Sequence, residues 1–140
     1  MRMSVLLLIL AAAAVVGYFL LPDGRQAKIP TAATGEPMIE VVVPELTGNA
    51  RLGEKIFEAK CAVCHGRNAA GQKGIAPPLV HQIYRPGHHA DAAFLLAPRN
   101  GVRAHHWTFG NMPPVPGVTD GDLKMVVAYI RALQRANGIN

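Results

Sequence analysis

The chain has 140 residues, of which 50% are apolar and only 6% aromatic, and its formal net charge is +5. This apolar content excludes an intrinsically disordered chain, because disorder accompanies low hydrophobicity. Two cysteines are too few for a disulfide scaffold. The basic excess is too small to indicate a nucleic-acid-binding protein, so we expect no nucleic-acid partner.

An uncharged apolar run occupies the N-terminus from Ser4 to Leu21. As a helix rising about 1.5 Å per residue, it would span roughly 27 Å, close to the ~30 Å hydrocarbon core of a bilayer. Arg2 precedes the run, which favours a cytoplasmic N-terminus. We therefore predict that residues 1–21 form a single transmembrane helix in the cytoplasmic (inner) membrane, and that the rest of the chain lies in the periplasm.

A cleaved signal peptide is the alternative for this segment. The small residues Ala11–Ala14 offer a cleavage site, although cleavage there leaves an apolar region of only about seven residues. Both interpretations export the rest of the chain. Residues 22–45 are rich in proline and lack a helical period, so we predict a tether. Within it, Glu40–Pro44 is expected to be a short extended piece that packs on the domain.

Residues 46–140 are predicted to form a single domain. Its first helix is expected over Gly48–Cys61 and would be started by Thr47 or Asn49. Apolar side chains recur at helical spacing in and just after this helix, at Leu52, Ile56, Ala59 and Val63.

Two further helices are expected towards the C-terminus. Asp91 would cap a short helix that ends at Pro98 and Gly101. Thr119 and Asp122 have the capping-box spacing that opens a last helix. The apolar stripe of that helix comprises Leu123, Val126, Val127, Ile130 and Leu133. Three helices without an alternating strand pattern indicate an all-α fold class.

The chemistry-bearing motif is the C-x-x-C-H sequence from Cys61 to His65. The thiols of Cys61 and Cys64 can reach the two vinyl groups of one porphyrin, and His65 then offers an imidazole to the iron. A thioredoxin-like motif would need a βαβ setting, and a zinc site would need two further ligands at metal spacing. The sequence shows neither, so the motif predicts one covalently attached haem c.

Residues 46–140 resemble a class I cytochrome c of the small bacterial type. The matching residues are Gly53, Phe57, Cys61, Cys64, His65, Pro77-Pro78-Leu79, Met112-Pro113 and Tyr129-Ile130. The resemblance implies a cytochrome c fold of about three helices wrapped around one haem. It also implies that Gly53 lets the first and last helices cross closely, with Phe57 packing against Tyr129.

The resemblance also implies a second axial ligand and a partner for the first. Met112 lies in a loop rich in Gly and Pro, and its thioether would reach the iron from the face opposite His65. The carbonyl of Pro77 would accept a hydrogen bond from the imidazole. The expected cofactor-binding residues are therefore Cys61, Cys64, His65, Pro77 and Met112, with His65 and Met112 as the metal ligands and no catalytic residue.

Five further histidines lie between the motif and Met112, namely His81, His88, His89, His105 and His106. One of them would replace Met112 as a haem ligand, or they would contact the haem propionates, form a second metal site, or remain solvated in loops. We favour propionate contacts or solvated loops, because adjacent rings point in different directions on ordinary backbone.

The predicted function is an electron carrier rather than an enzyme, because a six-coordinate haem offers no vacant site for a substrate. Its partners would be the membrane and a redox protein such as a respiratory complex or another cytochrome. Basic side chains would either steer an acidic partner or form an ordinary solvated surface; they are Lys55, Lys60, Arg67, Lys73, Arg85 and Arg103. The alternatives are a small peroxidase-like haem enzyme and a haem-based ligand or redox sensor with a labile sixth ligand.

Overall fold

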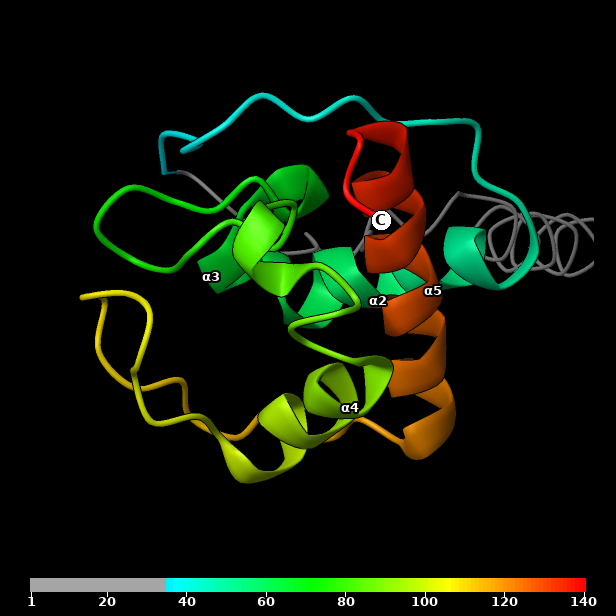
Figure 1. The fold of residues 1–140 in the computed structure, drawn as a ribbon. Coiled ribbons are helices and arrows are strands. Elements are labelled where there is room, and N and C mark those ends of the chain that lie inside the picture. The colour runs from blue at the N-terminus through cyan, green and yellow to red at the C-terminus, as the bar shows by residue number, and fades with distance from the viewer. Residues whose placement is uncertain (1–34) are drawn as a thin grey trace, which may run out of the picture.

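The structure, a computed structural model, describes residues 35–140, so the predicted anchor and the first part of the tether lie outside the described residues. Its helices are α2 (Gly48–Lys60), α3 (Ala62–His65), α4 (Asp91–Asn100) and α5 (Asp120–Ala136), with 3-10 turns η1 (Arg67–Ala69) and η2 (Gln82–Tyr84) (Figure 1). The all-α prediction is confirmed for this part of the chain. Among these helices, none is both long enough and apolar enough to cross a membrane.

The crossing of α2 and α5 organises the core. Gly53 stands at the crossing, where a β-carbon would overlap the backbone carbonyl of Met125. One turn further along α2, the ring of Phe57 packs against Tyr129 at a centroid distance of 5.5 Å. Both rings are fully buried. The close helix contact and the aromatic packing that the family resemblance implies are thus confirmed.

The buried face of α2 differs from the predicted stripe. Leu52 is 48% exposed and Val63, beyond the end of the helix, is 61% exposed. The buried residues of α2 are instead Gly53 and Phe57. The reason is that α5 approaches most closely where a side chain is missing, so the helix turns its glycine towards its partner. Of the predicted stripe, Ile56 packs partly buried against the core, whereas Leu52 is exposed.

Helix α5 begins as predicted. The Thr119 hydroxyl accepts a hydrogen bond from the Asp122 backbone N–H, and the Asp122 carboxylate accepts one from the Thr119 N–H at 2.9 Å. This reciprocal pair satisfies two backbone donors that the helix itself leaves unpaired. The five residues of the predicted stripe are all buried.

Helix α4 departs from prediction at its start and at Pro98, whereas it ends at Gly101 as predicted. Asp91 does not cap the helix, because its carboxylate accepts a hydrogen bond from Arg131 at 2.8 Å. Pro98 lies inside the helix, which continues to Gly101 with φ +75°. A proline so near the C-terminal end removes only one helix hydrogen bond. Its own carbonyl accepts a bond from the Val115 N–H at 2.7 Å.

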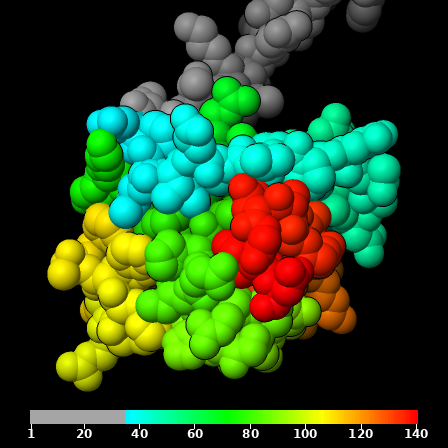
Figure 2. Space-filling model, turned by 45° about the horizontal axis from the view of Figure 1, so that its top comes forward, coloured from blue at the N-terminus to red at the C-terminus, as the bar shows by residue number. Residues whose placement is uncertain are grey.

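The segment from Gly35 to Leu46 lies along the domain, cyan at the top of Figure 1 and beside the C-terminal residues in Figure 2. Ile39, Val41 and Leu46 pack against the core. The Asn137 side chain bonds both the N–H and the carbonyl of Val42, at 2.9 and 2.8 Å. The extended packing expected for Glu40–Pro44 is therefore present.

Candidate functional site

The C-x-x-C-H motif forms a helical turn that continues directly from α2. The Cys61 N–H donates to the Phe57 carbonyl at 2.8 Å, which makes Cys61 the C-cap of α2. The Cys61 carbonyl then accepts from the N–H groups of Cys64 and His65, at 3.1 and 2.9 Å. Because one turn separates the two cysteines, their thiols are presented at one end of α2, as attachment to a single porphyrin requires.

The side chain of Cys61 is half-buried and that of Cys64 is exposed. Burial, with the nearby Cys64, raises the pKa of Cys61 to about 11. Redox-active C-x-x-C pairs instead contain a cysteine of lowered pKa, since the thiolate is the reacting form. The turn therefore lacks the electrostatics of a thioredoxin-like site, in line with the sequence argument.

His65 is buried, and its ring orientation is set by one hydrogen bond. Its Nδ1 lies 2.9 Å from the carbonyl oxygen of Pro77. A carbonyl only accepts, so Nδ1 carries the hydrogen and the ligating lone pair is on Nε2. Burial lowers the pKa of His65, against the opposing effect of this hydrogen bond. The ring is thus neutral and oriented, as an imidazole that ligates iron must be.

The side chain of Gln72 donates hydrogen bonds to the backbone of the motif. The sequence did not predict this role. Gln72 is 1% exposed, and its Nε2 lies 3.3, 2.7 and 3.1 Å from the carbonyl oxygens of Ala62, Val63 and Cys64. The Ala62 carbonyl also accepts from the Gly66 N–H at 2.9 Å, and carbonyls at the end of a short helix otherwise depend on donors from outside it. The Gln72 Oε1 accepts from the Gly35 N–H at 2.8 Å. One side chain therefore joins the motif to the segment that precedes the domain.

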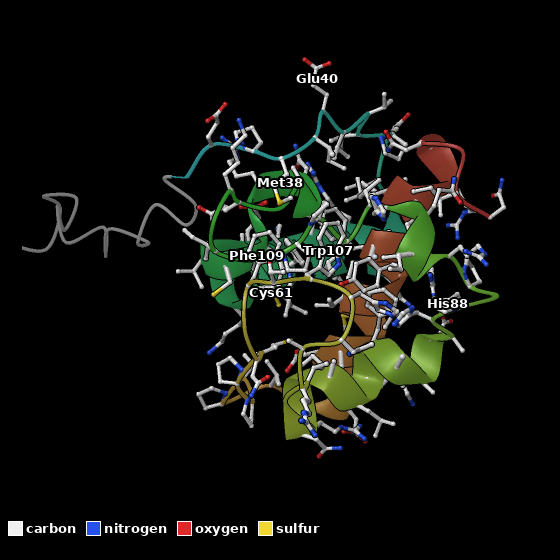
Figure 3. All side chains as sticks on the ribbon, turned by 60° about the vertical axis from the view of Figure 1, so that its left-hand side comes forward. Met38, Glu40, Cys61, His88, Trp107 and Phe109 are labelled. Atoms are coloured by element: carbon white, nitrogen blue, oxygen red, sulfur yellow. The ribbon has the colours of Figure 1, made fainter. Side chains whose placement is uncertain are left out.

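Met112 closes a loop that follows α4. Its backbone pairs with Val102 through two hydrogen bonds of 2.9 and 3.0 Å. Asn111 ties the loop across its base, because its Oδ1 accepts from the Ala104 N–H at 3.0 Å. Met112 itself is half-buried. The loop and α3 lie on the same side of the molecule, at the left of Figure 1, and Figure 3 looks onto this side.

Of the five histidines between the motif and Met112, one lies by itself and four lie together. His81 contacts the edge of Trp107 at a centroid distance of 5.2 Å. The other four gather into one cluster, in which the rings of His88 and His89 are 4.8 Å apart and those of His105 and His106 are 4.2 Å apart. The ring planes within each adjacent pair do differ, by 72° and 51°, but two segments fold against each other and bring the two pairs together.

Arg131 is a second residue that sequence reasoning missed. It is buried in α5, and its guanidinium donates to the backbone carbonyls of Tyr84 and His89 and to the side chains of Asp91 and Gln134. A buried guanidinium with all these acceptors fixes the chain before α4 against α5. No local pattern marks this role, since most of its partners lie about 40 residues away in the sequence.

Comparisons with known proteins agree with this geometry. The sequence profile described as Cytochrome c matches residues 50–134. The chain is also similar to the Cbb3-type cytochrome c oxidase subunit CcoP of Rubrivivax gelatinosus, with 34% identity over 87 residues. The matched region is 61% of this chain but only 26% of that protein. No solved structure matches the chain.

The profile match extends over more than half of the chain and includes the C-x-x-C-H turn and the Met112 loop. The crossing at Gly53 and the packing of Phe57 on Tyr129 lie within the same region. The protein therefore belongs to the cytochrome c family, as a class I c-type cytochrome with one covalently bound haem c, for which Cys61 and Cys64 are the available thiols.

Proposed function

We propose that this c-type cytochrome is a periplasm-facing, membrane-anchored carrier that passes single electrons between redox partners, with its haem iron held by His65 and Met112. The orientation of His65 is the observation that carries the proposal. Its Nδ1 is hydrogen-bonded to the carbonyl oxygen of Pro77 at 2.9 Å, so only Nε2 remains to bind iron. This is the arrangement of a permanent ligand, since metal-bound histidines donate their other N–H to such an acceptor.

Haem c supplies a one-electron change in the oxidation state of its iron. The residues of this chain supply two ligands of different kinds. His65 is held in a packed turn, and the soft thioether of Met112 favours ferrous iron and so raises the reduction potential. With both positions filled, the site has no vacancy for a substrate, which favours a carrier over a peroxidase-like enzyme or a gas sensor.

The relative from Rubrivivax is an oxidase subunit, which supports a respiratory complex as the redox partner. Of the six basic side chains considered for docking, Lys73 forms an ion pair with Glu36 at 2.8 Å. The other five are exposed: Lys55, Lys60, Arg67, Arg85 and Arg103. We propose that they steer an acidic surface of the partner. Electron-transfer rates that do not fall as salt is added would contradict this steering.

The membrane anchor rests on the apolar run from Ser4 to Leu21. Mass spectrometry of the purified protein would determine whether this segment is retained. We expect the intact chain plus one haem, recovered with the membrane fraction. A mature chain that begins after Ala14 and is recovered without the membrane would assign the segment to a cleaved signal instead.

The carrier assignment is tested by exposing the reduced protein to carbon monoxide. A ferrous haem with both axial positions filled should bind the gas only slowly, and its absorption spectrum should remain that of the ligand-free protein. Rapid binding would show an open or labile sixth position. That result would support the sensor or the peroxidase-like alternative and overturn the carrier.

A further inference from the structure

We propose that His88, His89 and His106 bind one divalent transition-metal ion, at a site separate from the haem. One ligating nitrogen from each of the three side chains lies within 4.8 Å of the other two. In Figure 3 His88 lies at the right of the domain, apart from Cys61 near the middle of the view. His106 belongs to the Met112 loop, but neither the haem motif nor Met112 itself is part of this group.

The three imidazoles come from two segments of the chain. His88 and His89 precede α4, and His106 lies in the loop that follows it. The ring of His106 is 5.4 Å from that of His88 and 5.2 Å from that of His89, measured between centroids. Two nitrogens that bind one ion at about 2.0–2.1 Å each lie at most about 4.2 Å apart, so small side-chain rotations from this arrangement would let the three rings share an ion.

His89 is prepared for ligation by its hydrogen bonds. Its Nδ1 lies 2.7 Å from the carbonyl oxygen of Ile83, which assigns the hydrogen to Nδ1 and the lone pair to Nε2. Its own carbonyl accepts from the buried Arg131. The N–H groups of His88 and His89 both donate to the Arg85 carbonyl, at 2.9 and 2.8 Å. The half of the site before α4 is therefore held rigidly.

The half after α4 is held less tightly. His106 lies in the loop closed by the Val102–Met112 pair, and neighbouring His105 is turned aside by a 2.8 Å contact between its Nδ1 and the Arg103 carbonyl. Trp107 donates from its indole N–H to the Tyr84 hydroxyl at 3.1 Å, which links the two halves. A bound ion would add a second link between them.

The donor set indicates the class of ion. Within the described residues the cluster contains imidazoles and no carboxylate. Imidazole nitrogens suit Zn²⁺, Cu²⁺ and Ni²⁺, whereas Mg²⁺ and Ca²⁺ require oxygen ligands. Three protein ligands leave a fourth position for water or for a group from another molecule.

The test is calorimetric titration of the untagged, haem-loaded protein with Zn²⁺, which has no redox chemistry of its own. We expect one Zn²⁺ per chain. His106→Gln and His88→Gln, both at exposed positions, should each weaken binding by about 10-fold or more. Because bound Zn²⁺ stabilises the folded state, it should also raise the melting temperature of the wild-type protein, and by more than that of either variant at the same Zn²⁺ concentration.

His81→Asn is the matched control. His81 lies outside the three-histidine group, and its Nδ1 accepts from the Ile83 N–H at the start of η2, a role that asparagine can also fill. This variant should bind Zn²⁺ as the wild type does. The proposal is overturned if wild-type protein binds no Zn²⁺, or if His106→Gln binds it equally well. A changed reduction potential in His88→Gln and His106→Gln, without Zn²⁺ binding by wild type, would assign the cluster to the haem propionates instead.

Discussion

The two segments that carry the predicted axial ligands are built differently. The His65 segment is packed: His65 and Gln72 are both buried, and Gln72 alone bonds three backbone carbonyls of the motif. The Met112 loop is held by one backbone pair, one exposed asparagine contact and the hydrogen bond from Trp107 to the Tyr84 hydroxyl. The segment of His65 is therefore fixed by buried packing, whereas the segment of Met112 depends on a few partly exposed contacts.

The largest effect on stability is expected when a glycine in each segment is replaced by alanine. Gly71 and Gly110 both have positive φ, at +73° and +89°. A β-carbon on Gly71 would lie 2.5 Å from the Pro78 nitrogen, whereas one on Gly110 would meet nothing within 4 Å. Gly71→Ala combines backbone strain with overpacking and should cost roughly 2–5 kcal/mol in the free energy of unfolding.

Gly110→Ala is the control for that substitution. It carries only the backbone strain and should cost about 1–2 kcal/mol. Guanidinium unfolding of the two haem-loaded variants measures both values. Equal losses in the two variants would remove the distinction between a packed and an open segment.

A smaller loss is expected for Gln72→Leu. The substitution leaves the carbonyls of Ala62, Val63 and Cys64 without their side-chain donor inside the protein, which should cost about 1–3 kcal/mol. Gln82→Leu, at an exposed position in η2, should change the stability by no more than about 0.5 kcal/mol. Unfolding curves of the two variants compare them directly, and similar values would show that Gln72 does not support the motif.

The smallest effect is expected for Asn111→Ala. It removes the exposed bond to the Ala104 N–H and should cost about 0.5–1 kcal/mol, confined to the Met112 loop. We expect the long-wavelength methionine–iron absorption band to disappear at a lower temperature than in wild type, while global unfolding is unchanged. A lowered global transition with an unchanged band would show that the loop is not a separate, weaker unit.

Features with a local signature were predictable from the sequence. The capping box at Thr119 is an interaction between residues three apart, and the haem motif is defined by spacing alone. The contact of Phe57 with Tyr129 was accessible only through the family resemblance, because it joins distant parts of the chain.

Features that depend on distant partners were missed. Gln72 and Arg131 donate hydrogen bonds mostly to backbone carbonyls. The fold places these carbonyls, and no sequence pattern identifies them. The stripe on α2 was misplaced because the close approach at Gly53, rather than apolar spacing, decides which face is buried. A second metal site was considered for the histidines but not favoured, because the cluster forms between segments on either side of α4 that the sequence does not place together.

The central claim, a carrier whose iron is held by His65 and Met112, is tested most directly by the absorption spectrum of the ferric protein before and after Met112→Ala. We predict that the wild type shows the long-wavelength methionine–iron band. We also predict that the variant lacks this band, binds carbon monoxide rapidly when reduced, and has a lower reduction potential. Persistence of the band in Met112→Ala, or a high-spin spectrum in the wild type, would contradict the assignment.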